Sequence, residues 1–94
     1  MLETDKQLLI KIIRKHLPQV TLYLFGSRAR GDYRSESDID IALDTGKSID
    51  PFILSTIQEE VEESIIPFTV DIVDMHNIAE TLKNQIIKDG ILWH

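Results

Sequence analysis

The chain has no cysteine, which excludes a disulfide framework and any thiolate metal site. A chain without cysteine suits a reducing compartment, and we expect a cytoplasmic protein. Long hydrophobic runs are also missing, since no stretch approaches the roughly 20 apolar residues that cross a bilayer. The chain begins MLETDKQ, which is acidic and polar, unlike a secretory signal. We therefore expect neither a membrane span nor a leader.

Positive charge is scarce. The sequence holds 10 Lys and Arg residues against 16 Asp and Glu residues, a formal net charge of −6 at pH 7. Nonspecific binders of nucleic acid usually present a basic face, because neutralising phosphates supplies most of their affinity. We therefore expect no direct binding of nucleic acid. An acidic surface suits a basic partner, although charge alone identifies none.

At 94 residues the chain is long enough for one small domain, and we expect that domain to span residues 1–94. Hydrophobic residues make up 43% and charged residues 28%, values typical of a folded protein rather than a disordered one. A domain this small is marginally stable alone, so its size is compatible with a partner protein or a dimer.

Hydrophobic periodicity predicts alternating helices and strands. The predicted order is helix 4–17, strand 20–25, a polar loop with a short helical turn at 27–37, strand 38–43, helix 50–64, strand 68–73 and helix 77–88. Residues 91–94 are expected to add a short edge strand. This order predicts the α/β class (α+β in some schemes), with a small mixed sheet of three to four strands flanked by helices.

Capping residues define several of these boundaries. Thr4 and Gln7 fit a capping box at the start of the first helix. Asp50 precedes a proline and fits an N-cap, and Gly90 fits a C-terminal cap. The expected core stripe of the second long helix consists of Leu54, Ile57, Val61 and Ile65.

The strand over 38–43 begins with a strict alternation, Asp38-Ile39-Asp40-Ile41. A period of two puts both carboxylates on one face of the strand. Two like charges so placed repel, which costs stability unless a cation lies between them. Their hard oxygen atoms suit Mg²⁺, which takes its remaining ligands from water and from substrate phosphates. An alternative is that both carboxylates simply face solvent from a half-exposed sheet.

A Gly-Ser pair precedes these carboxylates in the sequence. Gly26 and Ser27 end the strand over 20–25 and open a helical turn, where free backbone N–H groups make an anion site. Glycine lets a phosphate approach the backbone closely, and the serine hydroxyl adds a donor. An anion site beside a dication site is the arrangement that binds a metal-chelated triphosphate. Arg28 and Arg30 follow at once, and either contact the nucleotide or acceptor or pair with nearby acidic residues.

The strand over 68–73 and its end offer a third carboxylate, which would complete a two-metal centre. Asp71 and Asp74 are the candidates, and they lie on opposite faces because of the two-residue period. Asp71 is flanked by Val70 and Ile72, which predicts a place deep in the strand, where an unpaired carboxylate would be costly. Asp74 is expected at the strand's end, within reach of water. We therefore favour Asp71 as the metal ligand.

Together, the strings GSRARG and SDIDI and the isolated Asp71 resemble the nucleotidyltransferase superfamily with the DNA polymerase beta-like fold. In a chain this short they resemble the minimal nucleotidyltransferase (MNT) family, with its MntA-type antitoxins, over almost the whole length. The resemblance implies that Gly26 and Ser27 hold the β and γ phosphates of ATP. Asp38 and Asp40 would ligate the nucleotide-bound Mg²⁺. Asp71 would join Asp40 at a second Mg²⁺ and help deprotonate the attacking hydroxyl.

The same resemblance implies a partner and a reaction. Small MNT members often pair with a helical HEPN protein, and the MNT member acts as the antitoxin by adding AMP to a tyrosine of the HEPN toxin (AMPylation). The expected activity is therefore a Mg²⁺-dependent transfer of AMP from ATP to an acceptor hydroxyl. The alternative is a non-catalytic subunit that neutralises or scaffolds a HEPN partner by contact. Three mutually repelling carboxylates favour the enzyme, because a binding protein has no need of them.

Other polar residues carry weaker signals. Tyr33 and Arg34 are expected in a solvated loop rather than in the nucleotide pocket. His16, His76 and His94 lack the spacing of metal ligands and are expected at the surface.

Overall fold

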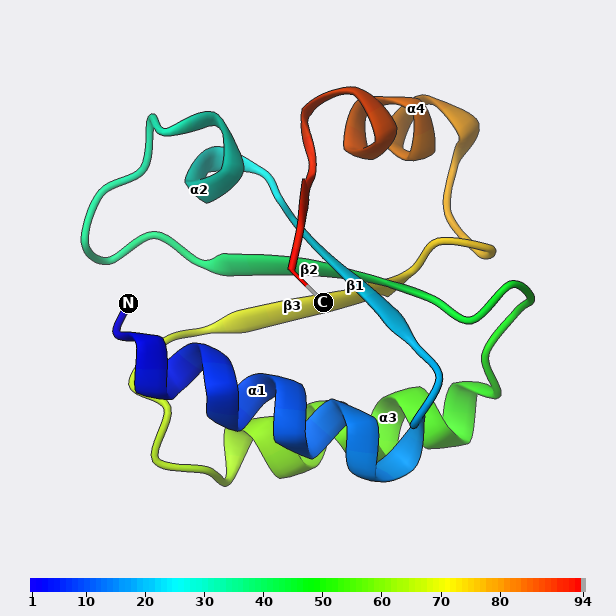
Figure 1. Cartoon of the computed structure of the whole chain (residues 1–94), viewed down its shortest axis with the longest axis horizontal. Coiled ribbons are helices and arrows are strands. Elements are labelled where there is room, and N and C mark those ends of the chain that lie inside the picture. Colours follow the sequence, from blue (N-terminus) through cyan, green and yellow to red (C-terminus); the bar gives the residue numbers. More distant parts are fainter. Residues whose placement is uncertain (94) are drawn as a thin grey trace.

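The structure is a computed structural model that describes residues 1–93, and it consists of helices on both sides of a four-stranded sheet (Figure 1). In chain order the elements are α1 (Glu3–His16), β1 (Thr21–Phe25), α2 (Ser27–Arg30), β2 (Ile39–Asp44), α3 (Pro51–Glu62), β3 (Val70–Asp74), α4 (Glu80–Asp89) and β4 (Ile91–Leu92). The predicted class and mixed sheet are confirmed, as is a short strand in the tail; His94 lies outside the described residues. Within residues 1–93 no helix is long and apolar enough to span a membrane.

The sheet has the strand order β3-β2-β1-β4. β1 runs antiparallel to both β2 and β4, whereas β2 and β3 are parallel. A parallel pair needs a crossover connection, and α3 supplies it. In Figure 1, α1 and α3 cover one face of the sheet, while α2 and α4 lie over the other.

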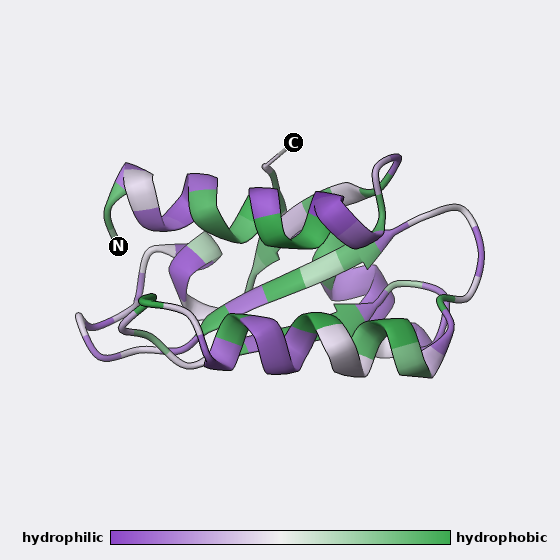
Figure 2. Ribbon diagram, turned by 90° about the horizontal axis from the view of Figure 1, so that it is seen from below, coloured by the Kyte–Doolittle hydropathy of each residue, from purple (hydrophilic) through white to green (hydrophobic). Residues whose placement is uncertain are grey.

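The main core lies between the sheet and the layer formed by α1 and α3. Its buried members from these elements include Leu9, Ile13, Leu22, Leu24, Ile39, Ile41, Leu43, Ile57 and Val61. Each large apolar side chain contributes about 1.5–3 kcal/mol when fully buried, so this layer dominates the stability of the fold. Figure 2, which looks at the molecule from the side of α1 and α3, shows hydrophilic residues interspersed with hydrophobic ones along both helices, as expected for helices with one wet face.

The opposite face of the sheet has thinner cover. Its buried cluster consists of Ala42, Met75 and Ile86, surrounded by partly buried side chains. α4 contributes one buried residue to it, Ile86, and α2 is only one turn long. Asp40 belongs to this face, because it alternates along β2 with the buried Ile39 and Ile41. The thinly covered face is therefore the one that carries the candidate site.

The capping box predicted for α1 is wrong. The helix begins at Glu3, so Thr4 lies inside its first turn. The Asp5 carboxylate instead accepts a hydrogen bond from the Leu2 N–H at 3.0 Å, and the Gln7 side chain donates to Glu3 at 2.9 Å. A side chain of the first turn that accepts a hydrogen bond from the N–H of the residue before the helix is thus present, as in a capping box. The residues involved are Leu2 and Asp5 rather than Thr4 and Gln7.

The predicted N-cap of α3 is confirmed, since the Asp50 carboxylate accepts from the Phe52 N–H at 2.9 Å. The predicted end of its core stripe is wrong: Ile65 is 88% exposed, and Ile66 is buried instead. α3 ends at Glu62, so the helical period no longer decides which face a residue at position 65 presents.

Candidate active site

The carboxylates of Asp40 and Asp71 come together where β2 and β3 lie side by side. The two strands are parallel, and their register pairs Asp40 directly with Asp71. Paired residues point to the same face, and neighbouring strands are about 4.8 Å apart. The two carboxylates are therefore neighbours on the thinly covered face. Asp71 is exposed and Asp40 is half-buried.

Asp38 lies two positions before Asp40, just outside β2, and is exposed. Burial raises the pKa of Asp40 above its ordinary value, and the carboxylates of Asp71 and Asp38 raise it further. The Arg30 guanidinium lowers the pKa of Asp40 and so partly offsets them. The negative charges of Asp38 and Asp71 thus disfavour ionisation of Asp40, the third predicted carboxylate.

This donor set fits a dication by its chemistry. Carboxylate oxygens are ligands that Mg²⁺ takes readily, and a cation would relieve the repulsion at Asp40. Across residues 1–93, no group of three or more His, Cys, Asp or Glu side chains is arranged to hold a metal ion by itself. An open set suits Mg²⁺ that arrives with a triphosphate, since this ion usually keeps ligands from water and substrate. The assignment of Asp38, Asp40 and Asp71 as metal ligands stays a prediction.

Gly26 is fitted to the Asp40 carboxylate. Its φ of 74° and ψ of −155° belong to a backbone region that is essentially restricted to glycine. A Cβ atom at this position would lie 2.2 Å from Asp40 Oδ2. Close approach of a phosphate is the predicted reason for this glycine. The structure adds a second reason, which is the space that the carboxylate occupies.

Ser27 begins α2 directly beside this contact. The Gly26 carbonyl accepts hydrogen bonds from the N–H groups of Ala29 and Arg30, at 3.2 and 3.1 Å. Within the part of the chain that the structure describes, the N–H groups of Ser27 and Arg28 have no backbone partner. They are therefore available as donors to an anion beside Asp40.

The sequence allows Arg28 either to contact the nucleotide or acceptor or to pair with an acidic residue, whereas in the structure its side chain binds the loop between α2 and β2. It is buried, and its guanidinium donates to the carbonyl oxygens of Ser35 and Ser37 in the loop between α2 and β2. The same group lies against the rings of Tyr33 and Phe68. A phosphate contact would compete with these bonds, so the geometry favours a structural role. Nothing in the sequence pattern distinguishes this arginine from its exposed neighbour Arg30.

Arg30, the other arginine of the motif, is exposed and lies near the carboxylates. Its Nε is 3.5 Å from Asp32 Oδ2, and its charge lowers the pKa of Asp40. Arg30 and Gly26 also line a hollow of about 110 Å³ between α2 and α4. Ligand pockets of small molecules usually measure about 300–1,000 Å³, so this hollow, which adjoins Gly26, is too small to enclose a nucleotide.

The environments expected for Asp71 and Asp74 are reversed in the structure. Asp71 is exposed, whereas Asp74 at the strand's end is 4% exposed. The Asp74 carboxylate accepts hydrogen bonds from the N–H groups of Ile49, at 2.8 Å, and His76, at 2.9 Å. The cost of an unpaired buried carboxylate was therefore the wrong reason for choosing Asp71. The shared face supports the choice instead, because Asp71 pairs with Asp40 and Asp74 does not.

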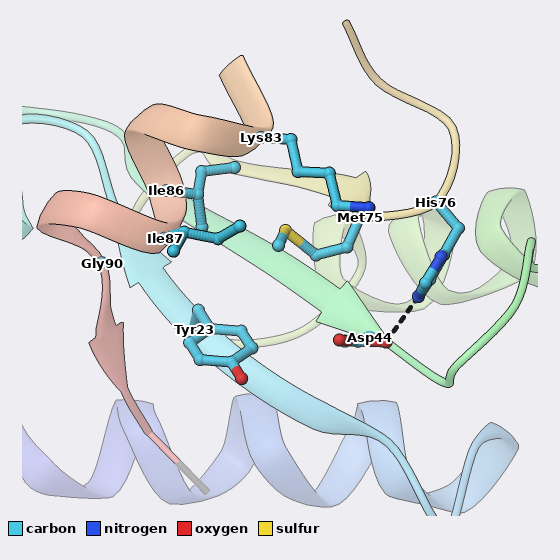
Figure 3. A pocket seen from close by; sticks show the side chains of 8 residues that line it. All are labelled: Tyr23, Asp44, Met75, His76, Lys83, Ile86, Ile87 and Gly90. Carbon is cyan, nitrogen blue, oxygen red and sulfur yellow. Dashed lines mark hydrogen bonds and ion pairs between the residues drawn. The ribbon is translucent and has the colours of Figure 1, made fainter. Parts of the chain in front are cut away.

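The larger hollow on this face lies away from the paired carboxylates. It measures about 280 Å³ and is lined by Tyr23, Asp44, Met75, His76, Lys83, Ile86, Ile87 and Gly90 (Figure 3). Asp44 ends β2, at the opposite end of that strand from Asp40. His76 Nε2 lies 2.7 Å from Asp44 Oδ1, so this histidine, expected only at the surface, links two segments of the chain.

Comparison with known proteins agrees with this geometry. The family model described as "Polymerase beta, Nucleotidyltransferase" matches residues 7–93. The protein adenylyltransferase MntA of Shewanella oneidensis is 30% identical over 95 residues, which cover 99% of this chain and 68% of that protein.

Two solved structures have the same fold. A toxin-antitoxin structure with AMP-PNP matches with a TM-score of 0.79 at 30% identity, over 98% of this chain and 73% of that chain. A complex of tri-AMPylated Shewanella oneidensis HEPN toxin with MNT antitoxin matches with a TM-score of 0.76 at 26% identity, over 99% of this chain and 72% of that chain. The chain therefore belongs to the polymerase beta-type nucleotidyltransferases, as a relative of the MntA protein adenylyltransferases, and is an enzyme.

Proposed function

We propose that this enzyme transfers AMP from ATP to a tyrosine hydroxyl of a helical HEPN partner and so acts as an antitoxin. One observation carries the proposal: Asp40 pairs with Asp71 across two parallel strands, and the Asp40 carboxylate lies against Gly26. The carboxylates of β2 and β3 thus lie beside the N–H groups at the start of α2, which are available as donors. That combination is what a metal-chelated triphosphate requires.

Each residue of the site has a proposed part. The backbone at Gly26 and Ser27, with the serine hydroxyl, would hold the β and γ phosphates. Asp38 and Asp40 would hold the Mg²⁺ that accompanies the nucleotide, and Asp71 with Asp40 would hold a second ion. Bound Mg²⁺ supplies neutralisation of phosphate charge and lowers the pKa of an oxygen nucleophile.

In the transfer, the tyrosine oxygen attacks the α phosphorus of ATP and a new P–O bond forms. The bond from the α phosphorus to the oxygen that bridges it to the β phosphate breaks, and pyrophosphate leaves. Asp71 is exposed on the same face as Asp40, which suits it to accept the tyrosine proton. Arg30 is exposed beside Asp40 and offers a positive charge to the pyrophosphate.

The small volume of the hollow beside Gly26 supports an acceptor hydroxyl that comes from another protein. The hollow beside Gly26 measures about 110 Å³, too little to enclose a small acceptor together with a nucleotide. Docking of a folded partner can orient an acceptor hydroxyl where the enzyme has no pocket wall. A relative of this chain has been solved with a HEPN toxin that carries AMP, which supports the same class of partner here.

The proposal is tested by intact-mass spectrometry of a HEPN partner after incubation with the enzyme, ATP and Mg²⁺. We expect the partner to gain one or more AMP units, on tyrosine. The Asp38→Asn, Asp40→Asn enzyme should leave the partner's mass unchanged. A matched control is the Glu59→Gln, Glu63→Gln enzyme, which loses one exposed charge from the last turn of α3 and one from the residue that caps its end, and should remain active.

The same experiment separates catalysis from neutralisation by contact. An unmodified partner in the wild-type reaction, together with a complex that forms equally well with the Asp38→Asn, Asp40→Asn protein, would contradict the enzymatic proposal. It would show instead that binding alone controls the partner.

A further inference from the structure

Arg28 is a charged residue near the site whose side chain is buried. It is 7% exposed, although it lies in a helix of a single turn. Its Nε donates to the Ser37 carbonyl oxygen at 3.1 Å, and its Nη2 donates to Ser37 and Ser35 carbonyl oxygens at 2.9 and 3.2 Å. Ser37 immediately precedes Asp38. The guanidinium is therefore hydrogen-bonded to the residue directly before Asp38, the first carboxylate of the site.

Two aromatic rings complete the environment of Arg28. Its guanidinium carbon lies 4.8 Å from the centre of the Tyr33 ring and 4.9 Å from the centre of the Phe68 ring. Tyr33 belongs to the same loop, whereas Phe68 lies two residues before β3, the strand that carries Asp71. One side chain from the segment with the Gly-Ser motif thus contacts two other segments, which lead to Asp38 and to Asp71.

The loop is attached to α2 at its start, where the Asp32 N–H donates to the Ser27 carbonyl oxygen at 3.2 Å. Two further bonds lie around Ser37. The Arg34 N–H donates to Ser37 Oγ at 2.8 Å, and the Ser37 N–H donates to the Arg34 carbonyl at 3.0 Å. Both bonds close the loop on itself and do not attach it to α2. We infer that Arg28 is a positioning residue, which sets the distance between Asp38 and the paired carboxylates Asp40 and Asp71 by clamping the loop to α2. This inference rests on the proposed function of those carboxylates as Mg²⁺ ligands.

The clamp requires arginine rather than a positive charge alone. A guanidinium presents several N–H donors in a rigid plane, so it can bind two carbonyl oxygens while its faces contact aromatic rings. A lysine ammonium keeps the charge but is a point donor without a flat face. Arg28→Lys therefore removes the clamp geometry and keeps the charge, which makes it the informative variant.

The test measures binding of AMP-PNP by calorimetry as a function of Mg²⁺ concentration, in the full chain. For Arg28→Lys we expect the Mg²⁺ concentration at half-maximal binding to rise about tenfold, equivalent to ~1.4 kcal/mol, with no change in the weak binding of metal-free nucleotide. Hydrogen exchange at residues 35–38 should become faster. Arg34→Lys is the matched control; this arginine is exposed in the same loop, and the variant should behave as wild type in both measurements.

Three outcomes decide the inference. An unchanged Mg²⁺ dependence in folded Arg28→Lys would overturn it. Equal loss of affinity with and without Mg²⁺ would also overturn it, because Arg28 would then contact the nucleotide directly. If Arg28→Lys does not fold, Arg28→Gln, which retains one planar donor group, is measured in the same way and judged by the same criteria. Failure of AMP transfer to a HEPN partner, with the expected shift in Mg²⁺ dependence intact, would refute the proposed function and leave the clamp standing.

Discussion

Asp40 is the residue at which stability and the proposed function conflict. Burial comes first among the causes that raise its pKa, and the Asp71 and Asp38 carboxylates follow. A raised pKa means that the folded state disfavours the charged form, so ionised Asp40 destabilises the fold above its folded-state pKa. That penalty disappears as the pH falls below the pKa of the unfolded chain, about 3.9 for an aspartate.

Replacing Asp40 with asparagine should therefore stabilise the metal-free protein at neutral pH. We expect Asp40→Asn to raise the free energy of unfolding by up to ~1 kcal/mol at pH 7, the scale of two like charges about 4 Å apart in water. The gain should vanish near pH 3, where both states bind the proton. Urea unfolding at the two pH values checks this, and a loss of stability at pH 7 would show that Asp40 is stabilised as an anion by its surroundings.

Asp71 and Asp74 should respond to mutation in opposite ways. Asp71→Asn should abolish AMP transfer and leave stability nearly unchanged, because the side chain is exposed. Asp74→Asn should cost about 1–3 kcal/mol, because an amide nitrogen would then face one of the two N–H groups that the carboxylate now satisfies. Transfer assays and urea unfolding of both variants measure this. A transfer defect confined to Asp74→Asn would mean that the wrong face of β3 was assigned to the site.

The sequence reveals residue types at the site better than their environments. The alternation of Asp40 with isoleucines correctly predicts that Asp40 lies on the face opposite Ile39 and Ile41, because the two-residue period of a strand is a local property. Burial is not local. The exposure of Asp71 and the burial of Asp74 and Arg28 depend on segments far along the chain, such as Ile49 and Phe68, and no periodicity reports those contacts.

At the scale of elements, the parallel pair of β2 and β3 assembles the site, and the far end of that pair is held by polar contacts. Asp44 ends β2 and accepts from the Gly46 N–H at 2.8 Å, and it lies 2.7 Å from His76 Nε2 in the segment after β3. The Gly46 N–H is the largest cause that lowers the pKa of Asp44, and His76 lowers it as well. These contacts join the turn after β2 to the start of the connection toward α4.

A lowered pKa means that ionised Asp44 stabilises the fold, and that the contribution is present above the unfolded-state pKa and lost as the pH falls through the folded-state pKa. Asp44→Asn should therefore reduce stability at pH 7 and converge with wild type as the pH falls below the folded-state pKa of Asp44. About a third of the Asp44 side chain is exposed, so the loss at pH 7 should stay below about 1 kcal/mol. Urea unfolding across this pH range measures the difference. A constant difference at all pH values would show that the carboxylate charge is not what stabilises these contacts.

Element order was predictable from the sequence, while several boundaries were not. α4 begins at Glu80 rather than residue 77, because the Asn77 N–H donates to the Asp74 carbonyl in a turn that follows β3. The capping box of α1 and the exposure of Ile65 were missed for a similar reason. Each depends on where a helix begins or ends, which tertiary contacts decide as much as local propensity. The register that pairs Asp40 with Asp71 also lay beyond the sequence pattern, since a two-residue period fixes faces and not partners.

At the scale of the whole molecule, one face of the sheet carries the main core and the other carries the candidate site. The face under α1 and α3 contains the main core, and the other face is only partly covered by α2 and α4 (Figure 1). Because this face is open, less apolar surface is buried there and its contribution to stability is smaller. The same openness leaves the carboxylates accessible to a nucleotide and to a docking protein in the proposed reaction. A second protein is thus the natural source of the missing wall in the proposed reaction.

The most direct measurement of the central claim is the position of the phosphorus atom that reaches the partner. A HEPN partner is incubated with the enzyme, Mg²⁺ and ATP labelled in parallel reactions on the α or the γ phosphate. Nucleotidyl transfer predicts that the α label becomes covalently bound to the partner, that the γ label leaves with pyrophosphate, and that Asp40→Asn removes the α signal. Retention of the γ label would identify phosphoryl transfer, and absence of both labels from the partner would contradict the proposed reaction altogether.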